Sequence, residues 1–331
     1  MAQQLSRLPG ARREAIASAS GRDADALESA RVKYGYARAL SIDELLADPG
    51  IDVVYVASAN SAHAAHSLAS LRAGKHALCE KPLTLLASEA EALFQEAERC
   101  KLLLAEGTFT ACLPAMTELR QRLAQIGRLE HVEIHKKIRT SISHCNPIIN
   151  SRELGGGVFD GCGSYSTHAL CVIFGAAEVA SLSEEDVEVI SIASPNGAVD
   201  WETTATLKLR GAPVALTHRA ADDTRPSLLR GEKGSIEFTL PYLHSITVNG
   251  EVIDTPYGGR PLRDLAAAEP GAPYGLHAGL GVEAAAIQDA LLRGARGPGT
   301  AYLHVDEMRA GAHLMDLIRQ RIPTHLHYNA G

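Results

Sequence analysis

The stretch from Gly74 to Leu83 (GKHALCEKPL) carries the most informative chemistry in this sequence. Its glycine is typical of a helix end, and the apolar run that follows is typical of a short buried strand. Glu80 and Lys81 come at the exit of that strand, and Pro82 restricts Lys81 to extended backbone geometry. Open α/β sheets bind ligands outside the carboxyl ends of their strands. We therefore expect Lys81 to face a ligand and to stabilise negative charge developing on a substrate oxygen.

A second segment, from Gly155 to His168 (GGGVFDGCGSYSTH), combines glycines with acid–base side chains. Three consecutive glycines permit close backbone approach and unusual backbone angles. Asp160, Tyr165 and His168 follow within about two helical turns of each other. Tyrosine and histidine both serve as proton donors or acceptors. The alternative is a glycine-rich turn that opens a buried helix, with Tyr165 and His168 as core residues.

Polar residues also follow the apolar run at positions 51–57 (IDVVYVA), namely Ser58, Asn60 and His63. A short polar side chain at this place can cap the next helix, or it can reach a cofactor along the edge of the sheet. Lys81 taken alone could equally be a surface lysine paired with Glu80. The presence of both segments, about twenty residues apart, favours a binding site.

Together these segments resemble the Gfo/Idh/MocA oxidoreductases. That family carries Thr-Pro-Asn-x-x-His, then at the same spacing Gly-Lys-His-x-x-x-Glu-Lys-Pro; here Ser58-Ala59 stands in for Thr-Pro. The resemblance implies that Lys81 and Tyr165 are catalytic, with Asp160 and His168 assisting. It also implies a set of residues that contact the cofactor: Ser58, Asn60, His63, Glu80, Lys81 and Pro82.

The glycine segment is most similar to the branch with dihydrodiol dehydrogenases and glucose–fructose oxidoreductase, in which tyrosine is the proton donor. The family's aspartate aligns with Gly161, so Asp160 comes one residue early, a rotation of about 100° on a helix. A second departure lies at Glu106–Ala111, where the family often has an aromatic residue and an arginine. The resemblance implies hydride transfer between NAD(P) and a sugar, polyol or related cyclic hydroxy compound. The alternative is a non-catalytic sugar-binding or regulatory member of the family.

The elements that position these residues form two domains. Residues 1–110 alternate strands and helices, which predicts parallel βαβ units of a Rossmann-like dinucleotide-binding domain. Residues 111–331 contain several alternating strands, which predict an α+β domain for substrate and oligomerisation, built on one large, mostly antiparallel sheet. The fold class is therefore α/β.

The strand and the Gly-x-Gly-x-x-Gly turn that normally open a Rossmann domain are missing before Met1–Gly10, so the sequence predicts an N-terminally truncated Rossmann domain. The absent strand would lie in the middle of the sheet and leave its neighbours' edges unpaired. Either the start is assigned at an internal methionine, or the chain is a shortened relative that binds cofactor poorly or not at all.

NADP is preferred over NAD, because Ser20 and Arg22 could meet a 2′-phosphate and the strand end Ser18–Arg22 contains no acidic residue. The alternative is that Arg22 is a solvated loop residue.

The composition describes a folded protein of 331 residues, 46% hydrophobic and 21% charged. Its net charge of -7 and the lack of a basic block argue against nucleic acid. No apolar run is long enough for a membrane span, and six scattered cysteines without a CxxC pair favour reduced thiols in the cytoplasm. We expect a homo-oligomer, a dimer or tetramer, through an apolar outer face of the C-terminal sheet. The alternative is a monomer with a polar outer face, as in His131, Glu133, His135 and Lys137.

Overall fold

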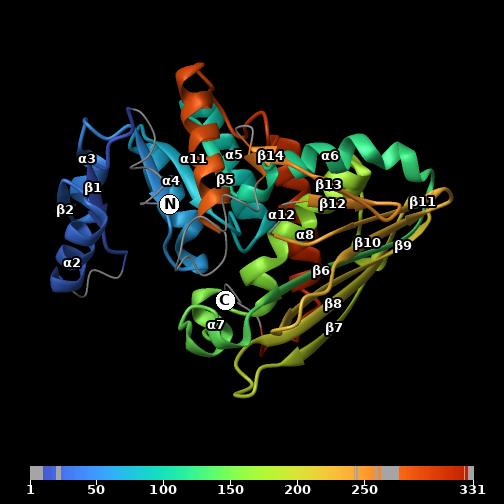
Figure 1. Ribbon diagram of the computed structural model, residues 1–331. Coiled ribbons are helices and arrows are strands. Elements are labelled where there is room, and N and C mark those ends of the chain that lie inside the picture. Colours follow the sequence, from blue (N-terminus) through green and yellow to red (C-terminus); the bar gives the residue numbers. More distant parts are fainter. Residues whose placement is uncertain are drawn as a thin grey trace.

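The computed structural model describes residues 10–19, 24–241, 243, 245–257, 260–261, 276–323 and 325–326. Strands and helices alternate in its N-terminal part, as the sequence predicts (Figure 1). In chain order these elements are β1 (Ala15–Ala17), α2 (Ala24–Tyr34), β2 (Arg38–Leu40), α3 (Ile42–Ala47), β3 (Val53–Val56), η1 (Asn60–Ala62), α4 (His63–Arg72), β4 (His76–Glu80), α5 (Ala87–Cys100) and β5 (Leu104–Gly107).

The N-terminal strands form two separate parallel groups. Strand β1 pairs with β2, and β3, β4 and β5 form a three-stranded sheet. Among the described residues no hydrogen bonds join β1 to β3, so each of these strands is an edge facing the other group. Figure 1 shows β1 and β2 with their helices standing apart from the rest of the molecule. The predicted unpaired edges in the middle of the domain are therefore present.

Local signals set the helix ends in this domain. Ser41 accepts a hydrogen bond from the Glu44 backbone while the Glu44 carboxylate accepts one from the Ser41 backbone, which forms a capping box at the start of α3. Helix α4 ends at Arg72, and Gly74 then takes a φ of 78°, a left-handed angle that favours glycine. The chain can thus turn directly into β4, which delivers Lys81.

The C-terminal part is an α+β domain built on one large sheet. Its helical elements before the sheet's last strands are η2 (Phe109–Cys112), α6 (Pro114–Arg122), η3 (Leu123–Ile126), α7 (Thr140–Cys145), η4 (Arg152–Leu154), α8 (Val158–Phe174), α9 (Ala176–Ala180) and η5 (Glu184–Asp186). Its strands are β6 (Leu129–Ile138), β7 (Val187–Ala193), β8 (Asp200–Leu209), β9 (Ala212–Ala220), β10 (Ser227–Gly231), β11 (Gly234–Phe238), β12 (Ser245–Val248) and β13 (Glu251–Asp254), and a small hairpin joins β14 (Pro256–Tyr257) to β15 (Arg260–Pro261).

The eight strands are ordered β13-β12-β11-β10-β6-β9-β8-β7. All neighbours are antiparallel except β6 and β9, so the predicted mostly antiparallel sheet is confirmed. Helix α8 covers the inner face of this sheet, and its side chains join the sheet's inward-facing residues in the largest hydrophobic core of the protein. Helix α8 carries the glycine segment, so this packing fixes the position of Tyr165.

Two further helices, α11 (Leu276–Leu292) and α12 (Val305–Arg319), return to the N-terminal sheet. Ile287 of α11 packs with Leu78 and Leu103, whereas Met308 of α12 packs in the core that contains Phe94. The tail of the chain therefore contacts both halves of the molecule, and the division at residues 110 and 111 stays a prediction. None of the described helices is long and apolar enough to cross a membrane.

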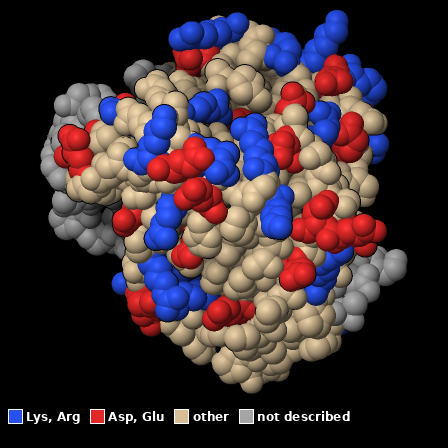
Figure 2. All heavy atoms as spheres, turned by 90° about the vertical axis from the view of Figure 1, so that its right-hand side faces the viewer, with Lys and Arg blue, Asp and Glu red and all other residues tan. Residues whose placement is uncertain are grey.

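The outer face of the large sheet is mostly polar. The Glu133 carboxylate lies 2.7 Å from Nε2 of His131 and 3.3 Å from Nε2 of His135, and Thr204 and Thr217 form a cross-strand pair at 3.3 Å. Figure 2, which faces the right-hand side of Figure 1, shows positive and negative side chains interspersed. Exposed apolar residues occur at Ile190 and Ile192 on the edge strand β7. The expected bare apolar face is therefore wrong, because the alternation along each strand places apolar residues inside.

Candidate active site

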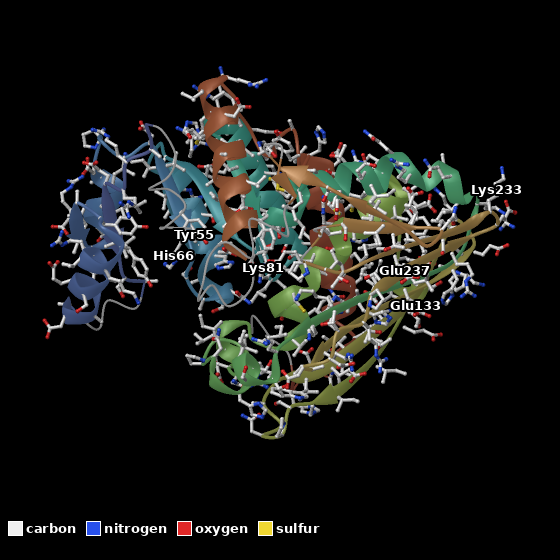
Figure 3. All side chains as sticks on the ribbon, in the orientation of Figure 1. Tyr55, His66, Lys81, Glu133, Lys233 and Glu237 are labelled. Atoms are coloured by element: carbon white, nitrogen blue, oxygen red, sulfur yellow. The ribbon has the colours of Figure 1, made fainter. Side chains whose placement is uncertain are left out.

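The two motif segments meet at Lys81 and Tyr165. The Lys81 ammonium donates a hydrogen bond to the Gly161 carbonyl at 2.7 Å and lies 5.5 Å from the centroid of the Tyr165 ring. Lys81 comes from the exit of β4, next to a cis peptide bond with Pro82, and Tyr165 comes from α8. Figure 3 shows Lys81 between the N-terminal sheet and the C-terminal domain. The predicted cation and the predicted proton donor are thus in contact.

A second lysine, Lys136, shares the Tyr165 ring. Its ammonium lies 5.6 Å from the ring centroid, and the side chain is buried. Burial lowers the pKa of Lys136 to about 8, and the neighbouring Lys81 acts in the same direction. The sequence analysis does not identify Lys136, although strand alternation could have done so. With positions 131, 133, 135 and 137 on the outer face of the strand, alternation puts Lys136 on the inner face with Ile134.

Phe109 completes the surroundings of the tyrosine. Its ring packs edge-on against Tyr165, with the two centroids 5.5 Å apart. The residue belongs to the segment Glu106–Ala111, where we noted a departure from the family pattern. The Glu106 carboxylate accepts a hydrogen bond from the Leu83 backbone at 3.2 Å, and burial raises its pKa. Glu106 therefore supports the turn that follows Lys81.

Glu80 is held by both of its oxygens. One accepts a hydrogen bond from the Tyr55 hydroxyl, and the other accepts one from the Lys81 backbone at 3.2 Å. Burial is the main reason that the pKa of Tyr55 rises, so this hydroxyl stays protonated and keeps donating. These bonds orient the loop that carries Lys81, and the predicted contact of Glu80 with cofactor stays a prediction.

Asn60 and His63 make contacts within the protein. The Asn60 amide donates to the Gly155 carbonyl at 2.8 Å, which ties the end of β3 to the glycine segment. His63 is buried, with one ring nitrogen 2.7 Å from the Pro82 carbonyl and the other 3.1 Å from the Ser58 carbonyl. Burial lowers the pKa of His63. Both side chains therefore brace the loops that would surround a cofactor.

Asp160 lies in a buried ion pair. Nε and a terminal nitrogen of Arg319 lie 2.9 and 2.6 Å from the same Asp160 oxygen, and both side chains are at least 97% buried. Arg319 also donates to the Leu85 carbonyl. The pair joins the start of α8, the end of α12 and the loop after Pro82. The ion pair therefore holds these three segments in position.

His168 lies deeper in the molecule. Neither ring nitrogen has a hydrogen-bond partner in the described protein, and burial lowers its pKa to about 4, so the ring is neutral. It lines a cavity of about 20 Å³ together with Ser164 and Glu307. That volume is close to the room that one water molecule needs. The surroundings match the alternative in which His168 is a core residue.

A larger cavity of about 830 Å³ opens between the two N-terminal sheets. Its lining includes Ala17 at the end of β1, Ala19, Ser58 at the exit of β3, and Tyr55 and His66, which Figure 3 labels. Its volume falls in the range of ligand pockets, and it reaches the carboxyl ends of parallel strands, where dinucleotides bind. Much of its lining comes from the facing strands β1 and β3 themselves. A glycine-rich cradle for the pyrophosphate is not found among the described residues, and Ser20 and Arg22 lie outside them.

Parts of this sequence are similar to known proteins. Residues 3–108 match the family model described as "Oxidoreductase family, NAD-binding Rossmann fold" (GFO_IDH_MocA). The trans-1,2-dihydrobenzene-1,2-diol dehydrogenase of Mus musculus is 32% identical over 54% of this chain and 54% of its own length. The enzyme of the same name from Xenopus tropicalis is 27% identical over 96% of this chain and 92% of its own. The chain spans 54–62% of the length of the curated relatives that it matches first.

Solved protein structures share the fold of this chain. The 3-ketoreductase KijD10 of Actinomadura kijaniata, in complex with NADP and TDP-benzene, superimposes with a TM-score of 0.76. It is 22% identical, and the match covers 96% of this chain and 92% of that one. The predicted combination of a Rossmann-like domain with a large C-terminal sheet is therefore confirmed.

Proposed function

We propose that this chain, which belongs to the Gfo/Idh/MocA oxidoreductase family, is an NAD(P)-dependent dehydrogenase acting on a CH–OH group. Its substrate is a sugar, polyol or related cyclic hydroxy compound. The observation that carries the proposal is the contact of Lys81 with Tyr165, because a cation and a phenol meet where a strand end of the Rossmann-like domain faces the C-terminal domain.

In the proposed mechanism Tyr165 exchanges the proton of the substrate hydroxyl. Lys81 orients that hydroxyl and stabilises the alkoxide charge that develops as the C–H bond breaks. Its hydrogen bond to Gly161 fixes the lysine against the start of α8, so little reorganisation is needed during the reaction. The nicotinamide, when bound, takes or supplies the hydride.

Ser58, Asn60, His63, Glu80 and Pro82 would surround the cofactor. Ser58 lines the large cavity, and its hydroxyl lies 3.0 Å from His66 Nδ1. The other four residues shape the loops at the ends of β3 and β4. In this proposal Asp160 acts through Arg319 as a positioning residue, and His168 assists only by packing.

The cofactor is NADP in preference to NAD, on the basis of Ser20 and Arg22 in the sequence. Calorimetric titration of the purified protein with NADPH and with NADH tests this choice. We expect tighter binding of NADPH; tighter binding of NADH would overturn the preference. Failure of both nucleotides to bind would favour the non-catalytic member of the family, for which the unpaired edges of β1 and β3 argue.

Assembly through the large sheet also stays a proposal. A dimer on this face would bury polar pairs such as His131 with Glu133, and the apolar residues Ile190 and Ile192 at its edge. Closed two-fold pairing is the commonest solution for such a surface. Light scattering at micromolar concentration distinguishes a dimer or tetramer from a monomer of 35.1 kDa.

Steady-state assays with neutral sugars, polyols and sugar acids test the activity itself. We expect production of reduced nicotinamide with at least one of these compounds, and its loss in Lys81→Met. Nucleotide binding without turnover of any compound would contradict the proposed reaction.

A further inference from the structure

Lys136 lies on the inner face of β6, opposite His218 of β9. Burial lowers the pKa of His218 to about 3, so this neighbouring ring is neutral. Val132 and Ile134 precede Lys136 on the same face of β6, and both are completely buried against α8. Only 8% of Lys136 is exposed. Its neighbour Lys137 points to the other face and donates to the Asp222 carbonyl. One lysine of the pair is thus in the core and the other is at the surface.

A buried ammonium group without an anion is strongly unfavourable. The Lys136 ammonium donates to the carbonyl of Lys137, and no carboxylate forms an ion pair with it among the described residues. The nearby Cys162 thiol donates to the Val158 carbonyl, and burial raises its pKa to about 11, so it is neutral. The protein therefore offers this cation no negative partner that the structure describes.

The two buried carboxylates that act on Cys162 are already engaged. Asp160 is held by Arg319, and Asp200 accepts hydrogen bonds from the Phe159 backbone and the Thr203 hydroxyl at 3.0 and 2.8 Å. Lys81 approaches the same tyrosine ring, so two positive groups converge beside the proposed proton donor. Strongly unfavourable buried charges of this kind are typical of functional sites.

We propose that Lys136 binds a carboxylate of the substrate, so that this enzyme acts on sugar acids, such as uronic or aldonic acids, in preference to neutral sugars. The inference rests on the proposed function, since it assumes that the hydroxyl being oxidised lies at Tyr165. The carboxylate is unchanged in the reaction. It neutralises Lys136, while the reacting carbon would give a hydride to a bound nicotinamide and the hydroxyl on that carbon gives its proton to Tyr165.

Matched pairs of compounds test this specificity. Glucuronate with glucose, and galacturonate with galactose, differ at the terminal carbon and keep the ring hydroxyls. Each pair is assayed with wild type, with Lys136→Met and with Lys137→Met as the control of the same chemistry on the outer face. A charge-assisted contact is worth about 1.5–3 kcal/mol, which corresponds to roughly 10- to 100-fold in kcat/KM.

We expect wild type to prefer each acid by about 10-fold or more, and Lys136→Met to remove that preference mainly by raising KM for the acid. Turnover of the neutral sugars should fall less in Lys136→Met than turnover of the matching acids, and Lys137→Met should behave as wild type. An equal loss of kcat for acid and neutral compounds would overturn the proposal, because it would mean that Lys136 acts on Tyr165 instead. A wild-type preference for neutral sugars would overturn it as well.

Direct binding separates this inference from the proposed function. Calorimetry with glucuronate and galacturonate, without nucleotide, measures recognition of the acid even if no hydride transfer occurs. Weakening by about 10-fold or more in Lys136→Met, with no change in Lys137→Met, supports the carboxylate site. Absence of binding to wild type, or equal binding to all three proteins, rejects it. Thermal melting of each variant confirms that the compared proteins are folded.

Discussion

Helix α8 contains two groups of titratable residues that act in opposite ways. In the reactive group, Tyr165 meets the ammonium groups of Lys81 and Lys136. In the supporting group, Asp160 is neutralised by Arg319, and His168 is enclosed without a hydrogen-bonding partner among the described residues. Asp160 lies about 140° around the helix axis from Tyr165, at 100° per residue. One short segment therefore supplies both a reaction centre and the supports that hold it.

The difference teaches that a residue's type and motif do not by themselves decide its role. An acid or base that works in catalysis must be able to exchange protons with a substrate. The ion pair of Asp160 and the burial of His168 both oppose such exchange. Mutations in the two groups should therefore differ in effect. Changes in the reactive group should lower the rate, and changes in the supporting group should lower stability or have little effect.

The largest fall in rate is expected for Lys81→Met, which removes a cation beside Tyr165. Removing a preorganised charge that stabilises a developing oxyanion costs about 10²- to 10³-fold in kcat. Because Lys81 makes one side-chain hydrogen bond, to Gly161, the melting temperature should change little. Steady-state kinetics and thermal melting measure the two quantities, with Lys208→Met on the exposed side of β8 as the control. Near-wild-type kcat/KM in Lys81→Met would remove this lysine from the mechanism.

Tyr165→Phe should follow, with a fall in kcat of about 10²-fold. The change removes one hydroxyl and keeps the ring, so the packing against Phe109 and the cations remains. Tyr302→Phe, at an exposed tyrosine, is the matched control. An unchanged rate would show that the proton moves through another group.

The sequence predicted those parts of the site that depend on local signals. The N-terminal strands and helices alternate as predicted, Gly74 follows the end of a helix, and Glu80 and Lys81 lie at a strand exit. Strand alternation shows that Lys136 lies on the inner face of β6. Its contact with Tyr165 could not be predicted, because it depends on which helix packs against that face. The pairing of Asp160 with Arg319 spans 159 residues of sequence, and no local pattern reports such a contact.

Asp160→Asn should act on stability first. It removes the closer of the two carboxylates beside the buried Arg319 guanidinium and leaves Asp316 at 3.9 Å. Breaking a buried pair from one side costs about 3–5 kcal/mol. Denaturant unfolding measures this loss, and the double variant Asp160→Leu with Arg319→Met should recover much of it, since both charges are then absent. A large fall in kcat with unchanged stability would instead make Asp160 a catalytic residue, as the family resemblance first implied.

The smallest effect is expected for His168→Leu. The imidazole is neutral because burial lowers its pKa to about 4, and it makes no hydrogen bond with the described protein. Leucine has a similar size and needs no polar partner, so removing the two unpaired nitrogens should change the free energy of unfolding by less than about 1 kcal/mol. We expect kcat/KM to stay within about 3-fold of wild type, because the neutral ring is enclosed by protein. If kcat instead falls by about 100-fold at unchanged KM, His168 is the group that moves the proton, and the proposed division of α8 into a reactive and a supporting group fails.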